Sequence, residues 1–75
     1  MKEHDRVVLT VDVPAEGLRV GDVGTIVHEY ADEAAYEVEF VHLDGNTAAV
    51  VTLEAGHIRA VRAHEITHAR ERAAG

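Results

Sequence analysis

Residues 36–42 read Tyr-Glu-Val-Glu-Phe-Val-His, residues 47–53 read Thr-Ala-Ala-Val-Val-Thr-Leu, and Leu-Asp-Gly-Asn separates the two runs. In the first run Tyr36, Val38 and Phe40 take one face while Glu37 and Glu39 take the other, which is the alternation of a half-buried strand. The Asp-Gly pair in the connector favours a tight hairpin turn. These residues therefore predict two antiparallel strands joined by a hairpin.

Three further runs are rich in β-branched residues and predict three more strands. They cover residues 6–13, which stop at Pro14, residues 23–30, and the short run 58–61. Gly24 inside the second of these runs suggests a bulge or a close backbone approach. Between the runs, residues 15–22 predict a long folded-over loop that tucks Leu18 and Val20 inward, and residues 54–57 predict one helical turn.

Five short strands, a long first loop and tight later connections predict an all-β fold, a small five-stranded SH3-like barrel. An open five-stranded sheet is the main alternative. We assign residues 1–61 to the barrel and residues 62–75 to a short C-terminal helical tail, because the tail has good helix-forming composition. Its apolar face is thin, so a helix there would have to dock or fray. The predicted core is Val8, Val23, Ile26, Val38, Phe40, Val51, Leu53 and Ile58, and the three aromatic rings, including Tyr30, are expected to be mainly core.

Composition limits what the chain can do. It has 75 residues and no cysteine, so one core of packed apolar side chains must supply its stability, without disulfides or thiolate metal sites. The absence of cysteines that could form disulfides, and a charged amino terminus without a long apolar run, predict a cytoplasmic protein that does not contact membranes. Fourteen acidic against seven basic side chains give a net charge of -7. Twelve of the acids precede Arg59, so the acidic body disfavours direct DNA or RNA binding.

Residues 18–27, residues 36–41 and residues 50–53 together resemble the small bacterial proteins grouped as domain of unknown function 4926. The likeness covers roughly residues 1–70. It implies a short SH3-like barrel with no established catalytic residues. The Gly-Asp-Val-Gly-Thr-Ile-Val element at residues 21–27 is also similar to the strand and turn of ribosomal KOW modules. Those modules bind RNA through basic loops, which this sequence lacks.

The tail contains the pattern His64-Glu65-Ile66-Thr67-His68, which matches the His-Glu-x-x-His form of zinc proteases. On a helix the two histidines would lie one turn apart, and Glu71 could supply a third ligand. A protease also needs a buried helix, a substrate cleft and second-shell support. We therefore expect a solvated tail with no cofactor and no catalytic residues, and we keep His64, His68 and Glu71 as an alternative metal site.

The residues favour a non-catalytic protein-binding module whose partner is a basic protein, as in an accessory-subunit or antitoxin-like pair. Acidic side chains on and around the central strands would steer the partner by charge. The tail would add a detachable contact or a surface for self-association into a homo-oligomer. The expected partner-binding residues are Glu29, Asp32, Glu33, Glu37, Glu39, Ile66 and Arg70. A metal-binding protein or zinc hydrolase using His64 and His68, and a KOW-like RNA-binding module, are the alternative functions.

Overall fold

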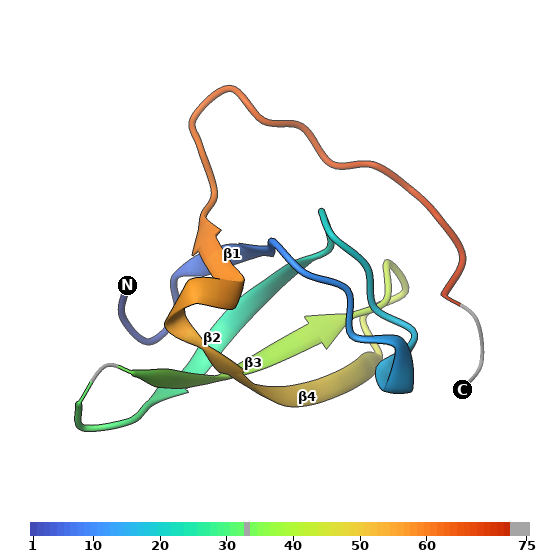
Figure 1. Ribbon diagram of the computed structural model, residues 1–75. Helices are drawn as coiled ribbons and strands as arrows, with labels where there is room; N and C mark the ends of the chain where they lie inside the picture. The colour runs from blue at the N-terminus through green and yellow to red at the C-terminus, as the bar shows by residue number, and fades with distance from the viewer. Residues whose placement is uncertain (33, 73–75) are drawn as a thin grey trace.

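The computed structural model describes residues 1–32 and 34–72, and it contains five strands and two short 3-10 turns (Figure 1). Five antiparallel strands confirm the predicted all-β fold. No helix within the described residues is long and apolar enough to cross a membrane. The strands are β1 (Arg6–Leu9), β2 (Val23–Glu29), β3 (Ala35–Val41), β4 (Thr47–Glu54) and β5 (Ile58–Ala60), and the turns are η1 (Pro14–Glu16) and η2 (Ala55–His57).

The five strands form one curled sheet in the order β4-β3-β2-β1-β5. Strands β1 to β4 follow one another as a meander, and β5 returns to pair with β1, from Val7↔Ala60 to Leu9↔Ile58. This is the strand order of an SH3-like barrel. The barrel is not closed, because no ladder within the described residues joins the edge strands β4 and β5. The predicted hairpin is confirmed, with Tyr36 opposite Leu53 and Glu37 opposite Thr52.

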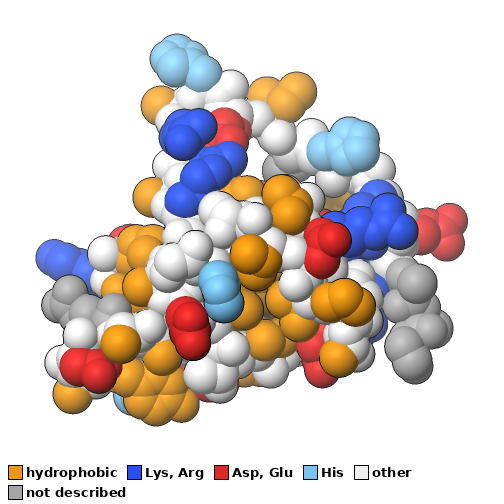
Figure 2. All heavy atoms as spheres, viewed as in Figure 1, with side chains coloured by type: hydrophobic (Ala, Val, Ile, Leu, Met, Phe, Trp, Pro, Cys, Tyr) orange, Lys and Arg blue, Asp and Glu red, His pale blue; other side chains and the backbone are white. Residues whose placement is uncertain are grey.

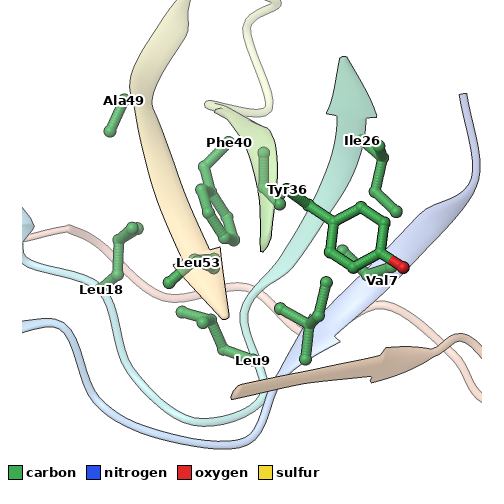
Figure 3. Close-up of a cluster of buried hydrophobic side chains, with 10 residues drawn as sticks. Val7, Leu9, Leu18, Ile26, Tyr36, Phe40, Ala49 and Leu53 are labelled. Atoms are coloured by element: carbon green, nitrogen blue, oxygen red, sulfur yellow. The ribbon is translucent and has the colours of Figure 1, made fainter. Parts of the chain in front are cut away.

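The core lies inside the curl of the sheet (Figure 3). Of the predicted core residues, Ile26, Val38, Phe40, Leu53 and Ile58 are buried, and Val51 is half-buried against them. Leu18 closes the core from the first loop, as the sequence predicted for this residue. The core members that the prediction omitted are Val7, Leu9 and Ala49, which complete the cluster together with Tyr36.

Two predicted core residues, Val8 and Val23, are not part of this cluster. The register pairs them with each other, but on the opposite face of β1 and β2 from Val7 and Leu9. Val23 is 36% exposed. Val8 is buried as predicted, with 6% of its surface exposed, and it lines a hollow of about 160 Å³ together with Arg59 and other residues. The sequence Val-Val-Leu has apolar residues on both faces of the strand, so alternation could not identify the inner one.

Gly24 is confirmed as a point of close approach between β2 and β3. A Cβ atom at this position would lie 2.6 Å from Cγ1 of Val38 and 2.9 Å from the carbonyl oxygen of Glu39. A bulge follows within β2, where the register shifts between Ile26 and His28. Both features allow β2 to bend tightly over the core.

The first strand is shorter than predicted, because the chain leaves the sheet after Leu9. The Thr10 N–H turns instead to the carbonyl oxygen of His57, at 2.9 Å. The loop then folds on itself through an isolated bridge between Val13 and Leu18. Val20, predicted to point inward with Leu18, is 60% exposed.

The predicted C-terminal helix is wrong for residues 62–72, which run as extended chain after one turn near Glu65. The tail leaves β5, arches above the barrel and reaches the loop that contains η1 (Figure 1). Ile66, the one large apolar side chain of the predicted helix face, is 93% exposed. Without a docked apolar face a helix this short is marginal, and arginine contacts to the barrel hold the chain extended instead. The last part of the predicted helix, residues 73–75, lies outside the described residues.

Candidate functional site: the acidic outer face of the sheet

The side chains of β2, β3 and β4 that point away from the core form one continuous surface. Strand alternation places Glu37 and Glu39 on it, opposite the inward-pointing Tyr36 and Val38. The bulge in β2 adds Val27 to the same side as His28, and both are exposed. We call this surface the outer face, and it comprises Thr25, Val27, His28, Tyr30, Glu37, Glu39, Val41, Val50 and Thr52.

Glu37 occupies the centre of the outer face and accepts hydrogen bonds from two hydroxyl groups. Tyr30 donates from its hydroxyl at 3.1 Å, and Thr52 donates to the same carboxylate oxygen from the neighbouring strand. The hydrogen bond to the Glu37 carboxylate raises the pKa of Tyr30, and the negative charge adds to the effect. The Glu37 carboxylate is thus held in one position by neutral donors.

Glu39 is fixed in the same manner one row along the face. Thr47 donates its hydroxyl to the Glu39 carboxylate at 2.7 Å. Beside these carboxylates, the rings of His28 and Tyr30 meet edge to face with their centroids 4.9 Å apart. Val27, Val41 and Val50 are 41%, 46% and 52% exposed and add apolar area. The face therefore combines oriented carboxylates with accessible apolar side chains.

The outer-face carboxylates have no cationic partner within the described residues. The ion pairs there involve Glu54, Glu65 and Asp22, and neither Glu37 nor Glu39 takes part in one. Hydroxyl donors orient a carboxylate but do not cancel its charge. The negative charge of the outer face can consequently attract an approaching molecule of positive charge.

The other predicted acidic residues lie towards the β2–β3 turn. Glu29 is half-buried at the end of β2 and accepts the Glu3 N–H at 3.1 Å, which ties the amino terminus to the sheet. Asp32 is exposed and accepts the Ala34 N–H at 3.1 Å. Glu33 lies outside the described residues. Among the described members of the predicted acidic set, Glu37 and Glu39 are the two that lie together on the outer face.

A cleft of about 720 Å³ opens where the outer face passes under the tail. Glu39 and Val41 contribute to its floor, and Ile66 and Arg70 line it from the tail. Hydrophobic side chains are visible below the arch of the tail (Figure 2). Three predicted partner-binding residues, Glu39, Ile66 and Arg70, therefore border one cleft although they are far apart in the sequence.

The tail is fastened at its far end by two arginines, which we call the tail clamp. The Arg70 guanidinium binds the Asp22 carboxylate through two nitrogens, one of them at 2.9 Å, and donates to the Gly17 carbonyl oxygen at 3.0 Å. Arg72 donates to the Glu16 carbonyl oxygen at 2.7 Å. Burial alone would raise the pKa of Asp22, but the hydrogen bonds from Arg70 and the Arg19 backbone outweigh it and lower the pKa.

A second ion pair fixes the start of the tail. Glu65 accepts two hydrogen bonds from Arg59, at 2.9 and 2.6 Å, and one from the Arg62 N–H at 2.7 Å. The hydrogen bond from Arg59 is the largest reason that the pKa of Glu65 falls to about 2. Glu65 is thus engaged in holding the turn, whereas the His-Glu-x-x-His pattern would assign it to catalysis.

The tail histidines do not form a preorganised metal site. His64 lies in the turn at the start of the tail and His68 on the extended chain after it. Both are exposed, and the helical spacing that would place them on one face is lost. Within the described part of the chain, no group of three or more His, Asp or Glu side chains is positioned to hold a metal ion.

Several residues and contacts that shape the site were not identified from the sequence, including the roles of Thr47, Thr52 and Asp22 and the contact that Asp22 makes with the predicted residue Arg70. Thr47 and Thr52 orient the outer-face carboxylates, and only the exact strand register shows which hydroxyl reaches which carboxylate. Asp22 and Arg70 are 48 positions apart, a separation at which no local pattern signals a contact. The opposite charges of the two side chains were the only indication in the sequence that they could form an ion pair.

The fold and this face define a small all-β protein with an SH3-like strand order and an acidic outer sheet face. Residues 3–60 match the family described as Domain of unknown function (DUF4926), and the chain belongs to that family. The match ends at the last residue of β5, so it spans the sheet and not the tail. No curated protein and no solved structure matches the chain.

Proposed function

We propose that this chain is a non-catalytic binding module whose outer face docks a basic segment of another protein. The observation that carries the proposal is the pair of oriented carboxylates, Glu37 and Glu39, without a cationic partner among the described residues. Such charges accelerate association and select partners of opposite sign. The neighbouring exposed valines supply apolar area that charge alone would not provide.

The alternatives drawn from the sequence receive no supporting observation. A zinc hydrolase needs a held metal, and the two tail histidines are exposed, one in a turn and one on extended chain. A KOW-like RNA module needs basic side chains on its binding surface, whereas this face presents carboxylates. A basic protein partner therefore fits the surface better than a metal or a nucleic acid.

The proposal is tested by neutralising the outer face and comparing a control of equal charge. The variant Glu37→Gln/Glu39→Gln removes two charges from the face, and Glu3→Gln/Glu71→Gln removes two exposed charges elsewhere. Proteins from the native host that bind the immobilised wild-type chain are identified by mass spectrometry, purified, and measured against all three forms. An exposed ion pair is worth about 0.2–1 kcal/mol, so the face variant should bind roughly two- to thirty-fold more weakly.

The control variant should bind the same partner as tightly as the wild type, and the wild-type affinity should fall as salt is added. Equal binding by the face variant and the wild type would contradict the proposal. Retention of nucleic acid, or a stoichiometric metal in the purified protein, would also contradict it and favour one of the alternatives.

A further inference from the structure

Strand β4 is an edge of the sheet, and its hydrogen-bonding direction can be assigned residue by residue. The Ala55 N–H donates to the Ala34 carbonyl oxygen at 3.0 Å, which makes this pair a hydrogen-bonded pair of the antiparallel ladder. Hydrogen-bonded and non-hydrogen-bonded pairs alternate along such a ladder. The register Tyr36↔Leu53 and Val38↔Val51 continues the hydrogen-bonded set. Val50, Thr52 and Glu54 consequently aim their backbone N–H and C=O groups away from β3.

Apart from the Glu54 carbonyl oxygen, which caps the start of η2 and accepts the first hydrogen bond of that turn, these backbone groups have no partner within the described residues. No further strand lies beyond β4, and none of the other backbone hydrogen bonds outside the ladders involves Val50, Thr52 or Glu54. Their side chains are exposed as well.

Natural sheets protect such edges with lysine, proline or inward-pointing charges. Residues 47–53 contain none of these. The bulge in the β3–β4 ladder falls at Ala48, so the regular stretch that follows it in β4 presents an unprotected template for another strand.

We infer that an extended segment of the partner, in which basic and apolar residues alternate, adds to the β4 edge as an antiparallel strand. The inference rests on the proposed function and names how the basic partner is held. Backbone hydrogen bonds supply affinity in this mode, and alternate side chains supply selectivity.

Charge complementarity decides the occupant. In an antiparallel pairing, residues of the added strand directly opposite Val50, Thr52 and Glu54 project onto the outer face. One of them then lies beside the Glu54 carboxylate, and the next lies in the row of Thr52 and Glu37. Lysine or arginine at these positions meets the negative charge of Glu37, which has no cationic partner among the described residues, and of Glu54, which lies 3.9 Å from His57 Nε2, whereas acidic residues there would be repelled.

A second copy of this chain is a poorer occupant. Its β4 contains Glu54 and no basic residue, and each copy has a net charge of -7. Antiparallel pairing of two β4 edges would align two acidic outer faces on one side of a continuous sheet. The residues between the outward ones in the added strand point to the inner side, next to Val51 and Leu53, where apolar side chains fit.

The test uses a blocked peptide of alternating lysine and valine as the probe, with affinity measured by fluorescence polarisation. In the inferred pairing the lysine N–H groups bond to β4 and the valine N–H groups point away. N-methylation of the lysine amides should weaken binding roughly ten-fold or more, since it removes several hydrogen bonds at once. N-methylation of the valine amides should leave the affinity within about two-fold.

A substitution in the protein, in place of a change in the peptide, tests the same edge. Val50→Pro removes one outward N–H that the ladder does not use, and Val50→Thr keeps that N–H as the matched control. We expect the proline variant to lose most of its affinity for the peptide and the threonine variant to keep it. The methylated peptides decide the question even if Val50→Pro does not fold.

Three other results would overturn strand addition, and they differ in what they imply for the proposed function. Equal binding of the two methylated peptides, with binding still lost in Glu37→Gln/Glu39→Gln, overturns strand addition and leaves the proposed function standing. Absence of any binding by the unmodified peptide overturns strand addition, and the host-protein measurement then judges the proposed function separately. A dimer in light scattering that Val50→Pro dissolves identifies a second copy as the occupant and overturns the inference.

Discussion

Replacement of Gly24 by alanine offers the sharpest test of the packing that curves the sheet. The added methyl group would lie 2.6 Å from Cγ1 of Val38, 2.9 Å from the Glu39 carbonyl oxygen and 3.0 Å from a ring carbon of Phe40. Non-bonded carbon atoms prefer separations of about 3.5–4.0 Å, so the first contact is roughly 1 Å too short. Side-chain rotation cannot relieve the whole clash, because one of the three contacts is to backbone.

Overpacking of this kind costs about 1–3 kcal/mol of the free energy of unfolding. A 75-residue domain is expected to have a total stability of about 4–11 kcal/mol. Gly24→Ala should therefore still fold, with its Tm lowered by roughly 4–8 °C for each kcal/mol lost. Thermal and urea unfolding followed by circular dichroism measure both quantities.

Gly56→Ala is the matched control, since no atom lies within 4 Å of its added methyl group. Its stability should stay within about 0.5 kcal/mol of the wild type or rise slightly. In the double variant Gly24→Ala/Val38→Ala, the closest clash is removed, so the combined cost should be smaller than the sum of the single costs. A Gly24→Ala protein as stable as Gly56→Ala would refute the close approach of β2 and β3.

The corrected core predicts that Leu9→Ala costs about 2–5 kcal/mol while Val20→Ala stays within about 0.5 kcal/mol, as urea unfolding would show; similar losses would contradict this core. The pKa of Asp22 lies below its ordinary 3.8, so the tail clamp contributes fully above that pH and is lost as pH falls through the lowered value. NMR contacts between Arg70 and the loop around Asp22 should therefore persist down to about pH 3.8 and be lost below it, whereas Arg70→Gln should release the tail at neutral pH; a tail unaffected by Arg70→Gln would exclude the clamp. Zinc and EDTA should each leave the Tm unchanged, because the exposed tail histidines are not preorganised, and a zinc-dependent rise abolished by His64→Ala would revive the metal site.

The local sequence pattern was sufficient to predict strands and their register where one strand face is apolar and the other is polar. Tyr36, Val38 and Phe40 alternate with glutamates, and a one-residue slip would bury carboxylates, so the β3–β4 hairpin has one acceptable register. The same alternation correctly placed Glu37 and Glu39 on one surface. Their hydroxyl partners depend on cross-strand neighbours, and these became visible only in the folded sheet.

Local pattern failed where both faces of a segment looked alike or where contacts were distant. Val7 and Val8 are chemically identical, and only the curl of the sheet decides that Val7 joins the core. Tyr30 was expected to be mainly core, but it is 41% exposed because it lies on the outer face, where its hydroxyl donates to the Glu37 carboxylate.

The amino-acid sequence by itself determined five strands, the central hairpin, the close approach at Gly24 and an acidic body, because each follows from neighbours within a few positions. Tertiary structure alone decided that Val7 and not Val23 joins the core, which hydroxyls hold the carboxylates and that the tail is extended. A short helix of thin apolar face gains little from its own hydrogen bonds, so the contact of Arg70 with Asp22 across 48 positions governs the path of the chain.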